Sequence, residues 1–181
     1  MFTRTARLLL RPGWAEDAHA LVDTIGDERV VRNLATAPWP YSLADAEAFL
    51  ARPRDAVLPS LLVFARTDGD PLLVGGCGLG AKPSGAVELG YWIARPFWGR
   101  GYASEAATAV IDIARTLRLP RLVGSHFLDN PASGRVLEKL GFEPTGVIAP
   151  RLSCGRGTEA LARVLTLELA SEAEAEESIV A

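Results

Sequence analysis

The sequence predicts an α/β protein of the α+β type, with a mixed, mostly antiparallel sheet and helices on both of its faces. Three observations lead to this class. Apolar runs in the middle of the chain are separated by short turn signals, the pattern of an antiparallel meander. Segments with apolar residues at helical spacing precede and follow this meander. A strand, a helix and a closing pair of strands come last, so neither a doubly wound sheet nor a barrel is expected.

The first third of the chain is expected to hold one strand and three helices. Ser42 and Asp45 have the spacing of a capping box, which opens the third helix, and Pro53 lies just beyond its end. Trp39 and Tyr41 alternate with prolines in a stiff loop before it. The expected strand covers residues 7–11, and the helices cover 16–25, 28–35 and 43–50.

The remainder is expected to alternate between strands and helices. Thr67–Asp70 is a hairpin signal. Asn130, Pro131 and Gly141 occupy the N-cap, first-turn and C′ positions of a helix. The expected strands cover 61–66, 72–79, 86–93, 121–128, 142–148 and 161–169, the helices cover 102–117 and 131–140, and 151–159 is a connection.

Size and charge indicate one folded unit. The chain has 181 residues, 49% hydrophobic and 23% charged, which is ordinary for a globular domain with a full core. The net charge is −3 and the arginines are scattered, so no nucleic-acid surface is expected. We predict a single domain over residues 1–170 and an acidic, mobile tail over 171–181.

Other features restrict the class of protein. Cys77 and Cys154 lie far apart, and the chain has 2 histidines, so neither a disulfide framework nor a metal site is expected. The apolar run near the N-terminus is too short for a signal peptide, and none approaches the roughly 20 residues that cross a bilayer. A cytoplasmic protein without a membrane partner is therefore expected.

The most informative stretch joins the strand over 86–93 to the helix that starts near Tyr102. Its loop contains Gly99 and Gly101, which lack a Cβ and can adopt positive φ. No Ser, Thr, Asp or Asn stands where the helix begins, so its first N–H groups could bind an anion. The pattern is neither a Walker loop nor a complete GxGxxG, which disfavours a phosphotransferase. An ordinary strand-to-helix turn with packing glycines is the alternative.

Three stretches together resemble the GNAT (GCN5-related N-acetyltransferase) superfamily. They are Glu88–Ile93 (ELGYWI), Trp98–Ala106 (WGRGYASEA) and Asp129–Phe142 (DNPASGRVLEKLGF). The resemblance extends over residues 7–169 and is greatest to the branch with the bacterial ribosomal-protein N-terminal acetyltransferases (RimJ/RimL-like). It implies the GNAT fold, with a splayed strand pair, and an acetyl-CoA-dependent N-acetyltransferase.

The resemblance also implies which residues bind acetyl-CoA. The pyrophosphate would bind main-chain N–H groups of the glycine loop, and the pantetheine arm would lie between the ends of the strands over 86–93 and 121–128. Asn130 is explained equally well as an N-cap, and Ser133 either is an ordinary first-turn serine or protonates the leaving thiolate. The implied cofactor-binding residues are Trp92, Ile93, Ala94, Trp98, Gly99, Arg100, Gly101, Tyr102, Ala103, Asn130 and Ser133.

Direct transfer to an amine requires a neutral amine, a stabilised oxyanion and a leaving thiolate. Glu88 is the first candidate base, directly or through water, with an exposed carboxylate as the alternative. His126 is the second, with a partnered structural histidine as the alternative. Trp39 and Tyr41 are expected to line the acceptor site with Glu88, although Trp39 could instead pack in the core.

A chain-terminal α-amine, of pKa about 7.7–8.0, suits a weak base better than lysine at about 10.4. The expected acceptor is therefore a protein or peptide N-terminus or a small amine, and the enzyme is a monomer or homodimer. A non-catalytic acyl-CoA-binding or regulatory protein on the same scaffold is the alternative.

Overall fold

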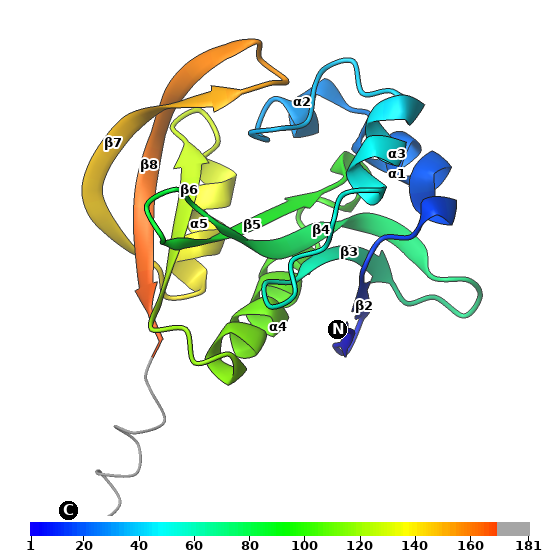
Figure 1. The fold of residues 1–181 in the computed structure, drawn as a ribbon, viewed down its shortest axis with the longest axis horizontal. Helices are drawn as coiled ribbons and strands as arrows, with labels where there is room; N and C mark the ends of the chain where they lie inside the picture. The colour runs from blue at the N-terminus through cyan, green and yellow to red at the C-terminus, as the bar shows by residue number, and fades with distance from the viewer. Residues whose placement is uncertain (170–181) are drawn as a thin grey trace, which may run out of the picture.

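The computed structural model describes residues 1–169, which form one eight-stranded sheet flanked by helices (Figure 1). The strands are β1 (Thr3–Arg4), β2 (Leu8–Arg11), β3 (Ser60–Ala65), β4 (Leu72–Ala81), β5 (Val87–Ile93), β6 (Arg121–Phe127), β7 (Glu143–Ser153) and β8 (Thr158–Glu168). The helices are α1 (Ala18–Ile25), α2 (Glu28–Val31), α3 (Leu43–Leu50), α4 (Tyr102–Thr116) and α5 (Pro131–Lys139), with short 3₁₀ helices η1 (Ala15–Asp17) and η2 (Arg95–Phe97). The tail predicted over 171–181 lies outside the described residues.

The strand order across the sheet is β1-β2-β3-β4-β5-β6-β8-β7, and the predicted mixed, mostly antiparallel sheet is confirmed. β5 and β6 are the parallel neighbours, as the intervening crossover helix α4 requires. Their ladder consists of one pair, Glu88 opposite Val123. The two strands therefore separate toward their C-terminal ends, which leaves unpaired main chain inside the sheet.

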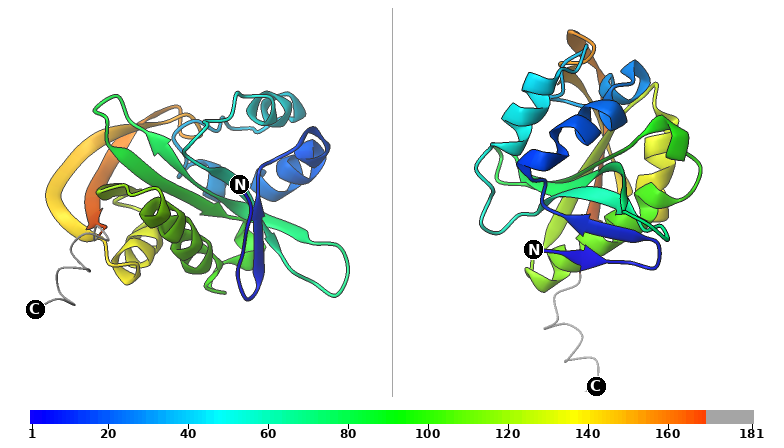
Figure 2. Two further views of the ribbon diagram at one scale, coloured as in Figure 1. Left: turned by 60° about the horizontal axis from the view of Figure 1, so that its bottom comes forward. Right: turned by 90° about the vertical axis from the view of Figure 1, so that its right-hand side faces the viewer.

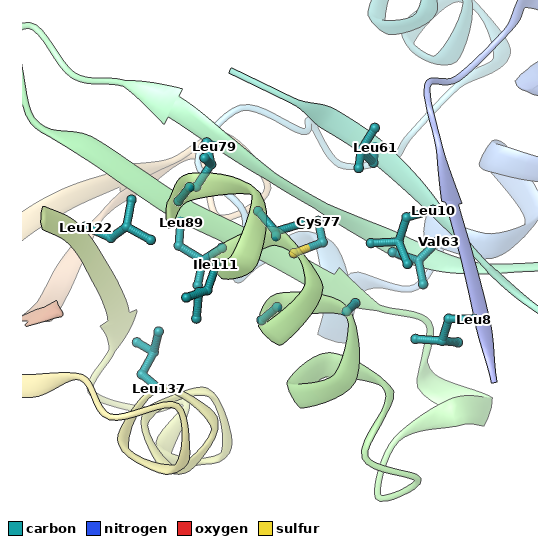
Figure 3. Packing of buried hydrophobic residues seen from close by; sticks show 14 of the residues in the cluster. Leu8, Leu10, Leu61, Val63, Cys77, Leu79, Leu89, Ile111, Leu122 and Leu137 are labelled. Carbon is teal, nitrogen blue, oxygen red and sulfur yellow. The ribbon is translucent and has the colours of Figure 1, made fainter. Parts of the chain in front are cut away.

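Helices cover both faces of the sheet, as predicted: α4 and α5 lie on one side and α1, α2 and α3 on the other (Figure 2). On the α4 side, leucines and valines of the sheet pack against small residues of the helix, such as Ala106 and Ala107, which are fully buried. Figure 3 shows this cluster, to which Leu79, Leu89 and Leu122 of the sheet and Ile111 of α4 belong. A second cluster lies under α1 and includes Leu21, Leu62 and Phe64. The site between β5 and β6 thus rests on two packed layers.

The β7–β8 hairpin is longer than the sequence predicts. Pairing continues through Arg151↔Ala160 to Ser153↔Thr158, so the expected connection over 151–159 shrinks to a tight turn. Glycine and charged residues in this stretch are typical of a loop, whereas cross-strand pairing keeps most of it extended. The register shifts between Pro144 and Ile148, where Gly146 has φ +81°. The hairpin bends over the sheet toward α2 (Figure 1).

The helix predicted over 28–35 is also corrected, since α2 ends at Val31. The residues that follow bond to the β7–β8 turn instead of continuing the helix. The Arg32 carbonyl accepts hydrogen bonds from Ser153 Oγ at 3.0 Å and Arg156 Nε at 2.7 Å. The Cys154 N–H donates to the Ala35 carbonyl at 3.1 Å. The hairpin turn is therefore tied to the segment after α2.

An ion pair between Arg11 and Asp17 fixes the start of the helical segment. Arg11 donates to both Asp17 oxygens at 2.7 Å, and the Trp14 N–H donates to one of them at 2.7 Å. The guanidinium also lies 4.0 Å from the Trp14 ring and 4.1 Å from the Phe64 ring. With side chains only 13% and 10% exposed, either partner would be left largely buried if the other were removed.

Asp17→Asn is therefore expected to lower the free energy of unfolding by about 2–4 kcal/mol at pH 7, measured by urea denaturation. Burial opposes ionisation of Asp17, but the bonds from Arg11 and Trp14 outweigh it and lower its pKa. Its stabilisation is complete above the unfolded pKa near 3.9 and is lost as pH falls through the lower folded value. The difference from wild type should shrink only below about pH 4. Exposed Asp23→Asn is the control, and equal losses for both variants would contradict the assignment.

Within the described range, no helix combines the length and apolar character needed to cross a membrane. Residues 1–169 likewise contain no group of three or more His, Cys, Asp or Glu side chains placed to hold a metal ion.

Candidate active site

Helix α4 begins without a side-chain cap, as its sequence predicts. Its N-cap is Gly101 with φ +79°, and Gly99 two residues earlier has φ +75°. A Cβ at Gly99 would meet nothing within 4 Å, so backbone conformation rather than space favours glycine there. The first N–H groups of a 15-residue helix are therefore available to an anion, with the helix dipole in its favour.

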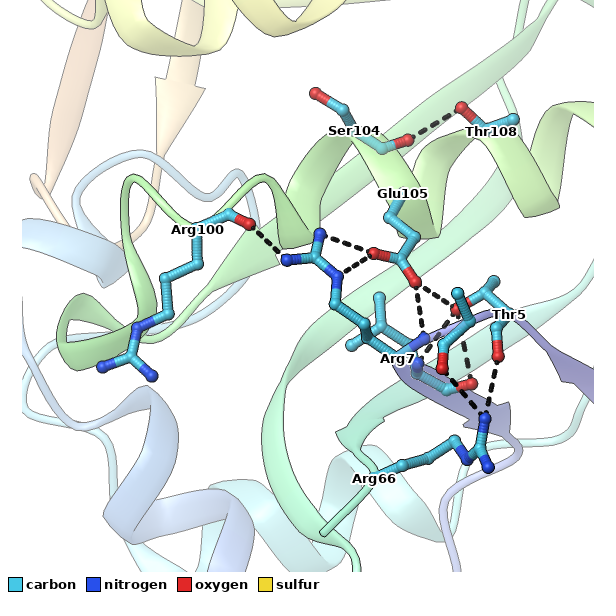
Figure 4. A network of polar contacts seen from close by, with 9 residues as sticks. Thr5, Arg7, Arg66, Arg100, Ser104, Glu105 and Thr108 are labelled. Atoms are coloured by element: carbon cyan, nitrogen blue, oxygen red, sulfur yellow. Dashed lines mark hydrogen bonds and ion pairs between the residues drawn. The ribbon is translucent and has the colours of Figure 1, made fainter.

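Arg7, just before β2, holds this loop in place (Figure 4). Its Nη1 donates to the Arg100 carbonyl at 2.9 Å, and its Nε donates to Glu105 Oε2 at 2.7 Å. Glu105, in the first turn of α4, also accepts from the Arg7 N–H at 2.9 Å and from the Thr5 hydroxyl. The guanidinium lies 4.9 Å from the Tyr102 ring centre. Sequence reasoning missed this anchor, because its partners are nearly 100 residues apart.

If the loop binds acetyl-CoA, as the resemblance implies, Arg7→Gln is expected to raise the KM for acetyl-CoA by about three- to tenfold with a smaller change in kcat, because each lost hydrogen bond is worth about 1 kcal/mol. Steady-state kinetics measure both constants. Arg4→Gln on β1, whose side chain is exposed, is the matched control. An unchanged KM for Arg7→Gln would show that the loop keeps its shape without the anchor.

A cavity of about 1030 Å³ extends from the α4 N-terminus through the gap between β5 and β6. It brings together most of the residues that the sequence assigns to the cofactor. Ala94 and Arg100 are not among its lining residues. The Ala94 N–H donates to the Val74 carbonyl at 2.8 Å, and the Arg100 carbonyl is bound by Arg7. The assigned residues that line it are Trp92, Ile93, Trp98, Gly99, Gly101, Tyr102, Ala103, Asn130 and Ser133.

Two of these residues already have partners. The Trp98 indole donates to the Ile93 carbonyl at 2.6 Å, which fixes the loop against the end of β5. The Asn130 side chain accepts from the Ser133 N–H at 3.3 Å, so the N-cap interpretation is confirmed. Asn130 thereby positions Ser133 in the first turn of α5.

β5 presents different side chains on its two faces. Val87, Leu89 and Tyr91 pack on the α4 side, whereas Glu88 is on the other face, as alternation along the strand requires. The Tyr91 hydroxyl lies 2.9 Å from both the Ser133 hydroxyl and the Ser133 carbonyl. Burial raises the pKa of Tyr91 to about 12, so it stays protonated at neutral pH and can donate. The sequence placed Tyr91 on this face but gave no sign of its partner.

Glu88 is held by three side chains from other elements. The Ser125 hydroxyl donates to it at 2.6 Å, Arg151 donates to both of its oxygens, and Lys82 Nζ lies 3.6 Å away. Burial opposes ionisation, but hydrogen bonds from Arg151 and Ser125 and the two positive charges outweigh it and lower the pKa of Glu88. Glu88 is therefore a carboxylate at neutral pH and a weak proton acceptor. Arg151 and Lys82 were not predicted as site residues.

His126 lies on the opposite face of β6 from Ser125 and also lines the cavity. Its Nδ1 is 2.9 Å from the Phe127 carbonyl, which can only accept, so Nδ1 carries the hydrogen. A Cβ at Gly134 would lie 2.8 Å from His126 Nε2, so α5 packs directly against the ring. The imidazole is thus a partnered side chain on the α5 side, and β6 separates it from Glu88.

The two aromatic residues of the predicted acceptor loop differ in position. Tyr41 lines the cavity together with Pro38. Trp39 is not among the lining residues, and it is 42% exposed. Trp39 therefore neither lines the acceptor side of the cavity nor packs in the core.

Residues 7–143 match the family described as the Acetyltransferase (GNAT) domain. The chain belongs to the GNAT acetyltransferase family. It is 30% identical over 152 residues to the uncharacterized N-acetyltransferase YoaA of Bacillus subtilis, covering 80% of this chain and 84% of the relative. It is 39% identical over 62 residues to the Escherichia coli ribosomal protein uS5-alanine N-acetyltransferase, covering 34% and 32%.

Among solved structures, the ribosomal L7/L12 alpha-N-protein acetyltransferase RimL in complex with coenzyme A superimposes with a TM-score of 0.75 at 18% identity, covering 93% of this chain and 98% of that one. The GNAT fold is therefore confirmed, with its resemblance to the ribosomal-protein acetyltransferase branch. Members of the family transfer the acetyl group of acetyl-CoA to an amine, so this acetyltransferase uses acetyl-CoA. The uncapped α4 terminus and the gap in the sheet fit that molecule's pyrophosphate and extended arm.

Proposed function

We propose that this acetyltransferase transfers the acetyl group directly to an α-amine, that of a small molecule or of a chain terminus. The observation that carries the proposal is the divergence of β5 and β6 beside the uncapped α4 terminus, within one cavity that also reaches Glu88. A donor bound on the α4 side and an acceptor on the Glu88 side would meet where the strands separate.

The glycine loop from Gly99 to Ala103 would hold the pyrophosphate through its N–H groups. Arg135 and Lys139 of α5 also line the cavity and would meet the nucleotide phosphates. Acetyl-CoA supplies a thioester carbonyl and a thiolate leaving group. Its arm would lie in the gap beside Trp92 and Ile93.

Tyr91 and Ser133 would supply the proton that the departing sulfur needs. The Tyr91 hydroxyl has one hydrogen and two acceptors within 2.9 Å, the Ser133 carbonyl and the Ser133 hydroxyl. When Tyr91 donates to the Ser133 hydroxyl, the hydrogen of Ser133 is free to point into the cavity. Ser133 would donate that hydrogen to sulfur and recover one from solvent through Tyr91. The high pKa of Tyr91 keeps this pair protonated.

Glu88 would bind the incoming ammonium or a water molecule that accepts its proton. Because the pKa of Glu88 is lowered, the carboxylate gives little driving force for removing that proton. Neutralising lysine costs about 3.4 kcal/mol more than neutralising a chain-terminal α-amine, a pKa difference of about 2.5 units. The weak base therefore favours an α-amine over a lysine side chain.

The test is thiol release from acetyl-CoA over a panel of amino acids, short peptides, polyamines and lysine derivatives, with mass spectrometry of the products. Transfer to α-amines at a higher kcat/KM than to ε-amines is the expected result. A preference for ε-amines would contradict the assignment. Tight acetyl-CoA binding without thiol release on the whole panel would favour the non-catalytic alternative.

Glu88→Gln is expected to lower kcat/KM by at least about tenfold, by a nearly constant factor from pH 6 to 9. The factor is constant because the lowered pKa keeps Glu88 ionised across this range, so the rising limb of the profile belongs to the acceptor amine. Exposed Glu143→Gln is the control. An unchanged kcat/KM would remove Glu88 from the mechanism.

A further inference from the structure

The cavity lining is cationic, although the protein has a net charge of −3. Cations outnumber carboxylates in it by three to one. The cationic side chains are Arg29, Arg52, Lys82, Arg135, Lys139 and Arg151, and the carboxylates are Asp45 and Glu88. Such an excess in a concave site raises the local concentration of anionic ligands.

The cofactor accounts for only part of this charge. Arg135 and Lys139 belong to α5, on the donor side of the sheet, where the phosphates of acetyl-CoA would lie. The other four cations come from α2, the end of α3, the β4–β5 turn and β7, on the acceptor side. Asp45 also lies on this side, where its carboxylate closes the capping box with Ser42, so four cations stand against two carboxylates. Glu88 therefore faces more positive charge than it can balance.

Part of this imbalance lies around Glu88 itself. One carboxylate contacts both Arg151 and Lys82, which leaves a local charge of +1. Arg151 is 30% exposed and Lys82 is 37% exposed, so both cations can still be reached from the cavity, whereas Glu88 is 16% exposed. An unbalanced, half-buried cation next to a candidate amine site indicates that a ligand supplies the missing negative charge.

The spacing limits what that ligand can be. Lys82 Nζ lies 3.6 Å from Glu88 Oε1, and Arg151 contacts both carboxylate oxygens. Groups that bind Glu88 and these cations at the same time must be only a few bonds apart. The turn of the hairpin that carries Arg151 is also bonded to Arg32 and Ala35, which bridges this end of the cavity and favours a compact acceptor.

We propose that the acceptor is an amino-acid-like small molecule, an amine with a carboxylate, phosphonate or phosphate close to it. This inference rests on the proposed function. The ammonium group takes the place of Arg151 on Glu88, and the anionic group binds Arg151 and Lys82. The reacting form, a neutral amine with one negative charge, balances the local +1. The N–C bond forms as the C–S bond breaks, the amine loses its proton to water at Glu88, and the sulfur gains one from Ser133.

The experiment compares matched acceptors that differ in one charge. Phenylalanine, methionine and alanine are assayed against their carboxamides and their phosphonate analogues, with acetyl-CoA in excess. A carboxamide leaves the amine less basic than a carboxylate does, so intrinsic reactivity at neutral pH favours the amide. A kcat/KM at least about tenfold higher for the acids than for the carboxamides is expected. Because intrinsic reactivity favours the carboxamides, a preference for the acids must come from contacts with the protein.

Variants test which residues produce the preference for acids over carboxamides. Lys82→Gln should reduce the acid-to-amide ratio about three- to fivefold, and Lys82→Arg should restore most of it. Arg163→Gln removes one positive charge from the exposed face of β8, outside the cavity, and should leave the ratio unchanged. Equal losses for Lys82→Gln and Arg163→Gln would reduce the effect to net charge and overturn the proposal.

The possible outcomes distinguish failure of this inference from failure of the proposed function. Transfer to amino-acid amides or peptides that exceeds transfer to every free acid overturns this inference and leaves the proposed function intact. A preference for polyamines overturns both, because polyamines carry no α-amine. A preference for peptides with acidic first residues replaces the small acceptor with a macromolecular one and also overturns it. Thiol release that needs no amine acceptor overturns both this inference and the proposed function.

Discussion

Gly101→Val is expected to raise the KM for acetyl-CoA by at least tenfold. Gly101 has φ +79°, and an L-residue held in the left-handed region costs about 1–2 kcal/mol, more when it is β-branched. The loop can relieve this strain only by turning its N–H groups away from the ligand. Because the buried face of α4, including Ala106 and Ala107, is untouched, the fold should persist. Steady-state kinetics and thermal melting measure the two effects.

The control for this substitution carries the same strain elsewhere. Gly146 has φ +81° in the bulge of β7, where a Cβ would meet nothing within 4 Å. Gly146→Val should lose comparable stability and keep its KM for acetyl-CoA. If both variants show the same kinetic loss, the α4 terminus is not the pyrophosphate site.

Tyr91→Phe is expected to lower kcat by about 10- to 100-fold while the KM for acetyl-CoA changes little. The substitution keeps the ring that packs against the core and removes only the hydroxyl that holds Ser133. Proton donation to a leaving group contributes about 10²–10⁴ in rate, and a misdirected donor forfeits part of this. The split between kcat and KM distinguishes a proton-transfer role from loss of cofactor binding.

A double-mutant cycle with Ser133→Ala tests whether the two hydroxyls act as one unit. If Tyr91 acts by orienting Ser133, the double variant should be no slower than Ser133→Ala alone. Losses that multiply would show two independent roles. A Tyr91→Phe enzyme with wild-type kcat would remove the pair from the mechanism.

The architecture followed from the sequence wherever local signals agreed. The meander over β3, β4 and β5 was predicted by apolar runs between turns, and α5 by Asn130, Pro131 and Gly141. The open start of α4 was visible as a missing cap before Tyr102. These features depend on neighbours within a few residues, which the sequence displays directly.

The partners that define the site could not be predicted in this way. Glu88 and Arg151 are 63 residues apart, Tyr91 and Ser133 are 42 apart, and only tertiary pairing brings them together. The extent of β7 was also missed, since cross-strand pairing overrides the loop-like composition around Arg151. Arg151, which the sequence assigns to the connection over 151–159, instead lies in β7 and donates to both carboxylate oxygens of Glu88.

The single ladder pair between β5 and β6 divides the sheet of this acetyltransferase into two halves. At the level of the backbone, only that one pair of residues joins the two halves. A ligand that contacts both halves of the sheet cross-links them, and at a concentration of 100 times its Kd it raises the free energy of unfolding by about 2.7 kcal/mol. The two halves of the sheet should therefore move less relative to each other as more of the protein binds ligand in the gap.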